Sequence, residues 1–295
     1  MMRSERGFVL VAVLGVLALI TALVTEFAYG VFVNTSLLSN WQTSQRLSVA
    51  VNSGASIAAR LINEEIRKKS YTYPGTVNLP PYDVGDGLFA SVSIEDENSK
   101  FNLNDLVDPN GTANKKYVES FARLLGALEL DENLAWALAD WMDADEVPLI
   151  SGGEEGAKNA PFSSVRELRL VPGMDEETYK VLLPHVTIYG KKGFTKAQVN
   201  INGASVPVLM SISPDITEDM AKRIVGYREV TPFKAVADLQ KVAGFETLSI
   251  ALTGRITVRG EAFRVTVTAA SEDGLLRTVE FVMDRSGLVK YWEES

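Results

Sequence analysis

The hydrophobic pattern of this chain begins with an apolar stretch from Val9 to Val24 in which Thr21 is the polar exception. Beyond it, apolar residues recur at helical spacing, and no proline occurs between residues 26 and 69. This pattern predicts one long helix over residues 8–69, first wholly apolar and then amphipathic. At about 1.5 Å per residue, such a helix is far longer than a bilayer requires. The alternative is a membrane span and a separate helix, with a break between residues 30 and 39.

Strand-like alternation marks both ends of the remaining chain. Residues 88–95 alternate, residues 256–269 and 275–283 are β-branched runs joined by a Glu-Asp-Gly turn, and residues 288–292 predict a last short strand. Residues between about 100 and 255 read as short helices. The sequence therefore predicts an α+β fold in which a long helix packs on a small antiparallel sheet that carries a large, mainly helical insert.

The predicted insert contains two copies of one pattern. Each copy begins with Asn-x-Asn, continues through Phe-x-x-Val-x-x-Leu to a Val-x-Gly turn, and closes with a β-branched run. These features fall at residues 102–104, 162–168, 171–173 and 186–190, and again at 200–202, 233–239, 242–244 and 256–260. Fixed order and shared spacing predict a duplicated unit.

Each unit resembles a helix-hairpin-helix or SAM-like module, a class that often binds DNA through backbone N–H groups. A membrane-anchored DNA-uptake protein is therefore an alternative. Each hairpin has one glycine where the phosphate-binding version usually has two, and the net charge is −9, or −10 without residues 1–7. An acidic body repels phosphate, so no nucleic-acid partner is expected. Without cysteine, and with one histidine and no Walker, dinucleotide or Ser/His/Asp motif, the sequence does not indicate an enzyme.

An acidic cluster lies inside the first copy, where residues 140–146 read Asp-Trp-Met-Asp-Ala-Asp-Glu ahead of a Gly/Glu-rich loop. Four carboxylates in this run repel one another unless a cation or solvent offsets them, and oxygen ligands at alternating spacing suit Ca²⁺ better than zinc. The spacing is not that of an EF-hand. A solvated acidic loop at a helix end is the alternative.

The amino terminus places Arg3 and Arg6 ahead of Gly7-Phe8 and the apolar run. By the positive-inside rule, the start of the chain stays cytoplasmic and the body lies outside. A simple uncleaved anchor would share these features. The short basic leader, the Gly-Phe junction and the immediate apolar run together resemble a type IV prepilin or pseudopilin leader, which implies cleavage after Gly7 and methylation of Phe8 by a prepilin peptidase. Most such proteins carry glutamate at the position of Ala12.

The missing glutamate and the Asp-Trp-x-Asp-x-Asp cluster resemble the K-type minor pseudopilin of type II secretion systems. The resemblance implies a subunit that caps the pseudopilus tip, where it has no neighbour ahead, and primes assembly for export of folded proteins. It also implies a structural Ca²⁺ site, with the ligands expected at Asp140, Asp143, Asp145 and Glu155. The loop here is shorter and lacks the tyrosines expected of the family.

The same resemblance implies an inner-membrane, single-pass protein with a periplasmic body. Its implied partners are other minor pseudopilins in a heterotrimeric tip complex, the major pseudopilin filament, the inner-membrane assembly platform and the prepilin peptidase. A type IV pilus minor pilin would share the leader and is the nearest alternative. The expected segments are a leader (1–7), a transmembrane part (8–30), a periplasmic helix with the first strands (31–99), two repeats (100–190 and 191–255) and terminal strands (256–295).

Overall fold

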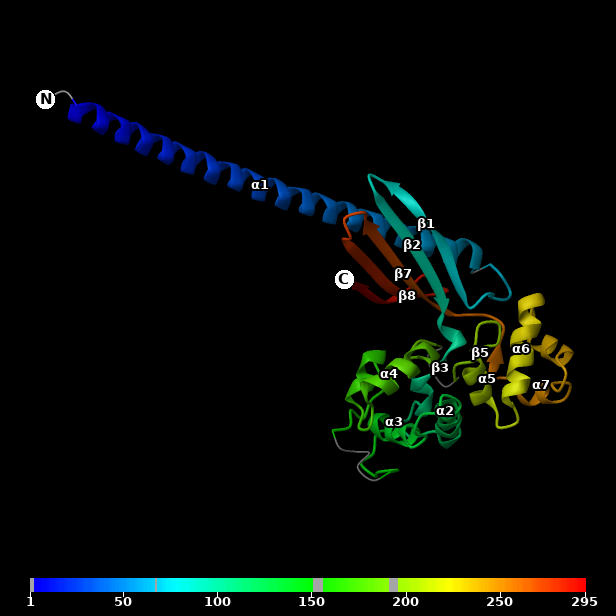
Figure 1. The fold of residues 1–295 in the computed structure, drawn as a ribbon. Helices are drawn as coiled ribbons and strands as arrows, with labels where there is room; N and C mark the ends of the chain where they lie inside the picture. The colour runs from blue at the N-terminus through cyan, green and yellow to red at the C-terminus, as the bar shows by residue number, and fades with distance from the viewer. Residues whose placement is uncertain (1–2, 67, 151–155, 191–195) are drawn as a thin grey trace.

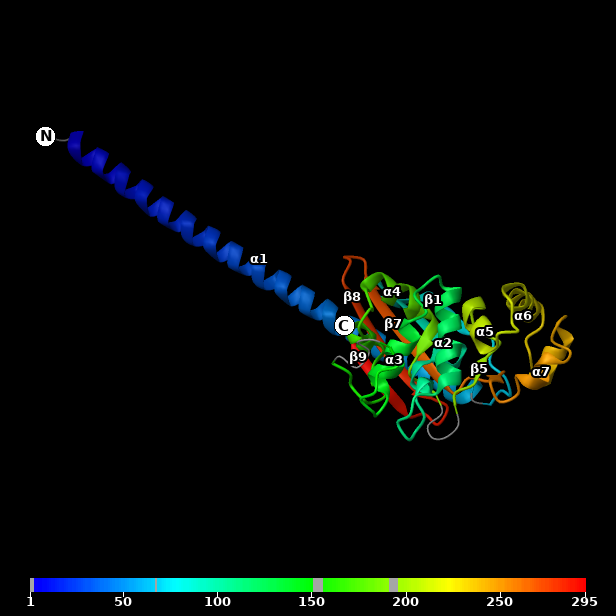
Figure 2. The same cartoon turned by 90° about the horizontal axis from the view of Figure 1, so that it is seen from below.

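A computed structural model describes residues 3–66, 68–150, 156–190 and 196–295 (Figure 1). Helix α1 (Arg3–Leu61) is continuous and ends in the π-helical turn η1 (Ile62–Ile66). Its amino-terminal part projects away from the body as a bare rod, and its carboxyl-terminal part lies on a sheet (Figures 1 and 2). The prediction of one unbroken helix is confirmed, although the helix ends a few residues before residue 69.

The sheet is antiparallel, with strand order β1-β2-β7-β8-β9. The strands are β1 (Thr76–Gly85), β2 (Leu88–Asp96), β7 (Ala262–Ser271), β8 (Leu276–Asp284) and β9 (Val289–Glu294). Along β7, buried residues alternate with half-buried ones, which is the pattern of a strand with one face on a core. The β7–β8 hairpin and the last strand are where the alternation predicted them.

Helix α1 covers one face of this sheet, and the two bury a core that includes Leu47, Val51 and Val265. The approach is close, since a Cβ on Gly54 would lie 2.6 Å from Cγ1 of Val267. Only a residue without a side chain fits there without displacing the strand. This close approach brings the backbone of α1 directly against β7.

The insert consists of two units, each closed by a two-residue parallel bridge between its start and its end. In the first unit β3 (Phe101–Asn102) pairs with β4 (Val186–Thr187). In the second, β5 (Val199–Asn200) pairs with β6 (Ile256–Thr257). The run predicted as one strand over residues 256–269 is therefore two strands, because its first residues close the second unit before β7 begins.

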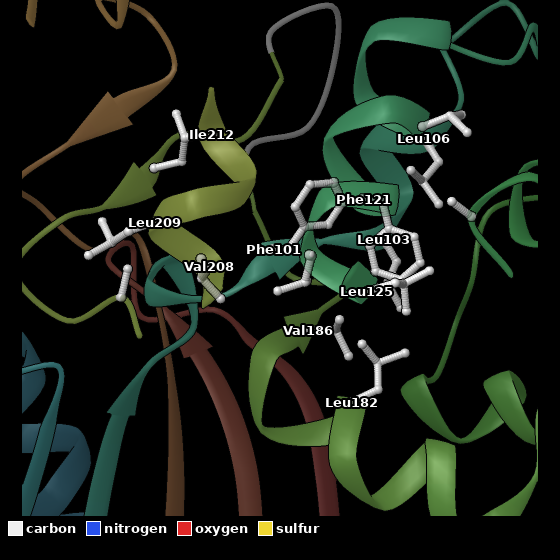
Figure 3. Close-up of a cluster of buried hydrophobic side chains, with 14 of the residues drawn as sticks. Phe101, Leu103, Leu106, Phe121, Leu125, Leu182, Val186, Val208, Leu209 and Ile212 are labelled. Carbon is white, nitrogen blue, oxygen red and sulfur yellow. The ribbon is translucent and has the colours of Figure 1, made fainter. Parts of the chain in front are cut away.

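Short helices fill each unit. The first contains α2 (Lys115–Ala127), α3 (Leu134–Met142) and α4 (Glu176–Leu182), with the 3-10 helices η3 (Leu103–Leu106), η4 (Val165–Leu170) and η5 (Leu183–His185). The second contains α5 (Val206–Ile212), α6 (Glu218–Val230) and α7 (Leu248–Ala251), with η6 (Val236–Lys241). The 3-10 helix η2 (Glu97–Ser99) joins β2 to the first unit. One apolar core runs through both units (Figure 3).

The second asparagine of each Asn-x-Asn pair performs the same task in both units. Asn104 accepts a hydrogen bond from the backbone N–H of Phe162 and donates to its carbonyl oxygen, at 2.8 and 3.0 Å. Asn202 does the same for Phe233, at 2.9 and 2.8 Å. We call this arrangement the asparagine clamp. Because it ties the first residues of each unit to its central phenylalanine, the duplication extends to individual hydrogen bonds.

Candidate assembly surface and polar junctions

The body covers only the last part of α1. Ser44 is held to the body by its Oγ, which accepts a hydrogen bond of 3.0 Å from Arg277, and Leu47 is the first buried residue among those described along the helix. Residues 8–43 span about 54 Å, whereas a bilayer's hydrocarbon core takes about 30 Å. The helix Phe8–Glu64 is apolar enough to cross a membrane, and its most apolar window is not buried by the rest of the chain.

The part of the bare helix over residues 31–43, here called the uncovered segment, lies between the predicted span and the body. It exposes large apolar side chains, and Trp41 is 60 % exposed. The others are Val31, Phe32, Leu37 and Leu38. Contiguous exposed apolar residues of this kind mark a surface that another molecule covers. This segment is therefore the candidate assembly surface.

The predicted processing residues lie at the far end of the same rod. Gly7 and Phe8 are within the continuous helix, and the side chain of Phe8 is 76 % exposed. Ala12 is also exposed. Cleavage after Gly7, methylation of Phe8 and the tip role of Ala12 stay predictions.

The acidic loop begins at the carboxyl end of α3. The carboxylate of Asp140 is buried and accepts hydrogen bonds from the backbone N–H groups of Leu149 and Ile150, at 2.8 and 3.2 Å. Asp143 is buried at the helix end. Asp145 is exposed and accepts a hydrogen bond from the N–H of Val147, at 2.9 Å. Two of the predicted ligands therefore hold the backbone of their own loop.

Glu155 lies outside the described residues. Within the described ranges, no group of three or more His, Cys, Asp or Glu side chains is placed to hold a metal ion. The described carboxylates thus do not form a Ca²⁺ site by themselves, and the Ca²⁺ hypothesis stays a prediction. A site at Asp140, Asp143 and Asp145 would require further oxygen ligands, because Ca²⁺ takes about six to eight.

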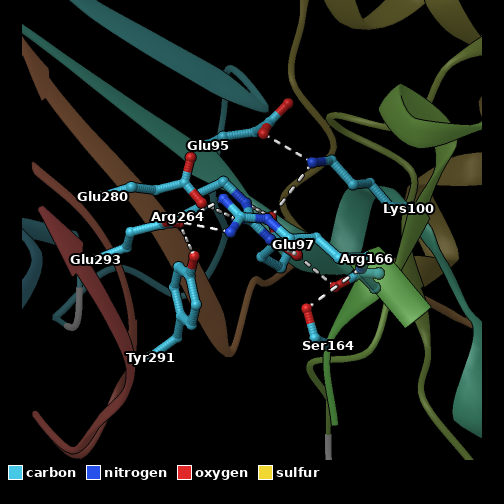
Figure 4. Close-up of polar contacts among 10 residues, drawn as sticks. Glu95, Glu97, Lys100, Ser164, Arg166, Arg264, Glu280, Tyr291 and Glu293 are labelled. Carbon is cyan, nitrogen blue, oxygen red and sulfur yellow. Dashed lines mark hydrogen bonds and ion pairs between the residues drawn. The ribbon is translucent and has the colours of Figure 1, made fainter. Parts of the chain in front are cut away.

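A buried glutamate connects the first unit to the sheet (Figure 4). Glu97 is fully buried, and its carboxylate lies 2.8 Å from Nε of Arg264 on β7 and 3.2 Å from Nζ of Lys100. It also accepts a hydrogen bond from the hydroxyl of Thr187, on the strand that closes the first unit. Burial raises the pKa of Glu97, but the two cations outweigh burial and hold it below its usual value. The ion pairs therefore compensate the buried charge, and we call this cluster the Glu97 junction.

The preceding residue, Asp96, connects the second unit to the sheet with neutral partners. Its carboxylate accepts hydrogen bonds from Oγ1 of Thr72, Nδ2 of Asn200 and the N–H of Asn98, at 2.9, 2.6 and 2.9 Å. Burial raises the pKa of Asp96 to about 6, against the lowering effect of these three donors. We call this cluster the Asp96 junction.

Neither junction could be found from the sequence pattern. Two acidic residues at the end of a strand are typical of a solvated turn, and acids are seldom fully buried unless paired. The partners that bury them, Asn200 and Arg264, are more than a hundred residues away in the chain. The one available signal is the change from strict alternation in β2 to an Asp-Glu-Asn run.

A cleft of about 410 Å³ separates the first unit from the outer face of the sheet. At its edge Arg166 pairs with Glu293 through two hydrogen bonds, one of them 2.9 Å long, and the hydroxyl of Tyr291 donates to the same carboxylate. Lys100 and Arg264 also line the cleft, and both are paired with glutamates. These charged side chains pair with one another. Such pairing is typical of a contact within one protein, here between the first unit and the sheet.

The hairpin of the second unit, residues 242–245, is surrounded by paired charges. Gly244 has a φ of +94°, and its backbone N–H donates to the carboxylate of Glu246 at 3.0 Å. Nearby cations pair with acids, as in Arg223 with Asp219 and Lys241 with Asp238. The backbone N–H of Gly244 and these two cations are therefore each paired with a carboxylate in this structure.

Comparisons with known proteins cover most of the chain. The family described as type II secretion system protein K matches residues 99–191, and the helix-hairpin-helix motif matches residues 195–251. The type II secretion system protein K of Pseudomonas aeruginosa is 30 % identical over 82 % of this chain and 78 % of its own length. The Klebsiella pneumoniae protein of the same description is 28 % identical over 90 % of this chain and 88 % of its own length.

The fold also matches a solved structure. A chain of the GspK-GspI-GspJ complex from the type 2 secretion system of enterotoxigenic Escherichia coli superposes with a TM-score of 0.67 and 19 % identity. The match covers 87 % of this chain and 98 % of that one. The long helix, the antiparallel sheet and the helical insert thus form a fold that has been solved in a secretion complex.

Proposed function

This chain belongs to the type II secretion system protein K family, and from that premise we propose that it caps the pseudopilus tip and primes its assembly. A minor pseudopilin is a structural component, so the proposed mechanism is one of packing and not of catalysis. The proposal comprises membrane insertion, processing, association through α1, and obstruction of further addition by the insert.

The uncovered segment is the observation that carries the proposal. It is too far along the helix to lie in the bilayer with residues 8–30, and the body does not reach it. An apolar side chain that is fully buried stabilises an association by about 1.5–3 kcal/mol relative to its exposed state. Helices of other minor pseudopilins, of the GspI and GspJ type found in the solved complex, would cover Trp41 and its neighbours.

The position of Ala12 supports the tip location. A carboxylate in an apolar segment is unfavourable unless it is paired, and in pilin-like assemblies it is thought to meet the amino terminus of the subunit ahead. A subunit with alanine needs no such partner. The insert lies beyond the sheet at the end of the molecule away from the amino terminus, where it would obstruct the next subunit (Figure 1).

The remaining steps follow the family. We propose that the prepilin peptidase cleaves after Gly7 and methylates Phe8, and that the body stays periplasmic while the helix remains in the inner membrane. The major pseudopilin filament and the assembly platform would then engage the primed complex. We also propose a structural Ca²⁺ ion at the acidic loop, with Asp140, Asp143, Asp145 and Glu155 as candidate ligands.

A pair of matched variants of the full-length chain tests the assembly surface. Trp41→Asp places a charge on the uncovered segment at an apolar position, and Asn40→Asp places the same charge at the adjacent polar position. Co-purification from membranes, with partners identified by mass spectrometry, should show loss of the other minor pseudopilins for Trp41→Asp and retention for Asn40→Asp. Equal recovery of partners with both variants would overturn the proposal.

The same mass spectra report the mature amino terminus, for which Phe8 is expected. An intact Met1, or a terminus near Ala28, would exclude pseudopilin processing. Recovery of type IV pilus subunits in place of secretion-system subunits would reassign the filament that this chain joins.

A further inference from the structure

We propose that a partner helix packs on one particular side of α1, the side that faces β9, and runs parallel to α1. This surface, here called the β9 flank, is formed by Leu37, Trp41, Ser44 and Ser48 of α1 and by Trp292 of β9. The inference rests on the proposed function, because it takes another minor pseudopilin to cover the uncovered segment. It adds that the contact continues from the uncovered segment onto the body.

Residue spacing places Trp41 on the side of α1 that faces β9. Ser44 accepts a hydrogen bond of 3.0 Å from Arg277, and Oγ of Ser48 donates to the carboxylate of Glu294 at 3.4 Å. These two serines therefore mark the side of α1 that meets the end of the chain. Trp41 precedes them by three and seven residues, which is the spacing of side chains on one helix face.

Trp292 extends this surface onto the sheet. It lies on the same face of β9 as Glu294, two residues further on, because side chains alternate along a strand. Its ring stacks on Phe281 of the core between α1 and the sheet, with 5.2 Å between the ring centroids, and it is 48 % exposed. The carboxyl terminus lies beside α1 (Figure 2). Two exposed tryptophans, Trp41 and Trp292, therefore share one side of the molecule, and tryptophan is prominent among the residues that dominate interface energies.

The other edge of the sheet differs, because β1 packs against the core that α1 and the sheet share. Val77, Leu79 and Tyr82 of β1 are partly buried there. Arg46 of α1 also pairs with Asp86, in the turn after β1, at 3.2 Å. The chain therefore covers the β1 side of α1 with its own residues, whereas the β9 side keeps large apolar rings exposed.

The polar side chains of the β9 flank are paired with one another. Arg277 donates to Ser44 and, at 2.7 Å, to the carboxylate of Glu294. Nδ2 of Asn52 donates to the carbonyl oxygen of Ser48 at 2.8 Å. A partner helix can therefore cover this surface without leaving Arg277 or Glu294 unpaired, which partly offsets the cost of removing their charges from water.

The direction of the strands gives the length of the flank. Strand β8 starts beside the serines of the flank, and the turn after it reaches Asn63, whose Oδ1 would lie 3.5 Å from a Cβ on Gly287. Strand β9 therefore runs back toward the amino end of α1 and places Trp292 about 17 Å beyond Trp41 along the helix axis. Leu37, which is 62 % exposed, lies about 6 Å further toward the predicted span. The whole flank is thus about 23 Å long, the length of about fifteen helical residues.

The partner that fits this surface is a helix that comes out of the membrane beside α1. The flank is continuous with the uncovered segment, which leads into the apolar part of α1. Within a bilayer a single segment satisfies its own backbone groups as a helix, so an element that follows α1 out of the membrane is helical. Anchored in the same membrane with its body on the same side, this element runs parallel to α1. The helix of another minor pseudopilin meets this description, whereas an extended peptide from solution does not.

Co-purification from membranes with full-length variants tests the β9 flank. Trp292→Asp places a charge on the flank, and Ile57→Asp places one nine residues after Ser48, on the opposite side of α1. The two side chains are matched in exposure, at 48 and 51 %. Trp292→Asp should reduce the recovery of one minor pseudopilin about tenfold or more, and Ile57→Asp should retain that partner. Loss of the same partner with Ile57→Asp would overturn the flank.

The comparison with Trp41→Asp separates this inference from the proposed function. Loss of partners with Trp41→Asp and their retention with Trp292→Asp would overturn the flank and leave the assembly surface in place. Retention of all partners with both variants would overturn the two proposals together.

A cross-linking measurement keeps both tryptophans in place, so it does not depend on the folding of Trp292→Asp. The chain has no cysteine, so Asn52→Cys and Ile57→Cys each provide a single attachment point for a benzophenone maleimide. Asn52 is on the flank, four residues after Ser48, and is exposed. Illumination of membranes should join the Asn52→Cys variant, but not the Ile57→Cys variant, to the helix of another minor pseudopilin, as mapped by mass spectrometry. Cross-links from Asn52→Cys to a second copy of this chain, or to lipid alone, would overturn the proposal.

Discussion

The two units of the insert share a frame but are attached to the body in opposite ways. Both have the asparagine clamp, a parallel bridge, and a 3-10 helix followed by a glycine with positive φ, Gly173 or Gly244. The first unit is held through Glu97 by ion pairs, and the second through Asp96 by neutral donors. Neighbouring acids in the sequence therefore respond to pH with opposite signs.

Comparing the two units distinguishes the interactions within each unit, which allow it to fold, from the interactions with the sheet, which position it. The pKa of Glu97 is lowered, so its contribution is present above its unfolded pKa and is lost on acidification. The pKa of Asp96 is raised, so its contribution is lost on alkalinisation. The duplicated frame stabilises both units, whereas their attachments to the sheet differ in how they respond to pH.

The largest loss of stability is expected from substitutions in the hairpin of each unit. Phe245 is fully buried in the second unit, whereas Met174 holds the equivalent place in the first and is half-buried. Phe245→Ala should lower the free energy of opening of its unit by about 3–5 kcal/mol, and Met174→Ala by about 1–2 kcal/mol. Hydrogen exchange of the most protected amides in each unit measures both values. Equal losses would mean that the hairpins are energetically equivalent.

The asparagine clamps offer a sharper comparison. Asn202 is 1 % exposed, and Asn104 is more accessible to water. Asn202→Ala leaves the N–H and carbonyl of Phe233 unpaired in the core and should destabilise the second unit by about 3 kcal/mol. Asn104→Ala should destabilise the first by about 1 kcal/mol, since water can replace part of the clamp. Exchange rates of the Phe162 and Phe233 amides report the result, with exposed Asn133→Ala as the control.

Calcium should distinguish the units, because the acidic loop occurs only in the first copy of the pattern. At a concentration 100-fold above its dissociation constant, Ca²⁺ should stabilise the first unit by about 2.7 kcal/mol and leave the second unchanged. Asp143→Asn with Asp145→Asn should remove the effect, and Asp238→Asn in the second unit should not. Equal thermal shifts with Ca²⁺ in the wild type and the double variant would refute the site.

The smallest expected effect concerns the edge of the cleft. The side chain of Arg166 is 63 % exposed, and solvent weakens its pairing with Glu293. Arg166→Met should therefore leave the first unit attached and change its thermal transition by no more than the error of the measurement. Detachment of that unit, seen as faster exchange at Thr187, would show that the Glu97 junction is insufficient on its own.

The sequence predicted the elements whose signals are local. Apolar periodicity identified α1 and the β7–β8 hairpin, and matched spacing located both ends of each unit. Strand β1 was not predicted from its own residues, because Pro80 and Pro81 disrupt the strand pattern and the structure accommodates them with a register shift on an edge strand.

The polar sites depend on distant residues and could be predicted less well. The spacing of the acidic residues did not reveal that the carboxylate of Asp140 accepts hydrogen bonds from the amides of Leu149 and Ile150. Asp96 and Glu97 are buried by residues of the insert and of β7, which come later in the sequence. The spacing of residues in the sequence does not predict this burial, because it does not specify which distant polar side chains contact each other between the sheet and the insert.

The most direct test of the proposed function is the location of this chain in isolated pseudopili. Gold-labelled antibody against the insert, viewed by electron microscopy on filaments from cells producing the wild-type protein, should mark one end of each filament. Wild-type label distributed along the shaft would contradict a capping subunit.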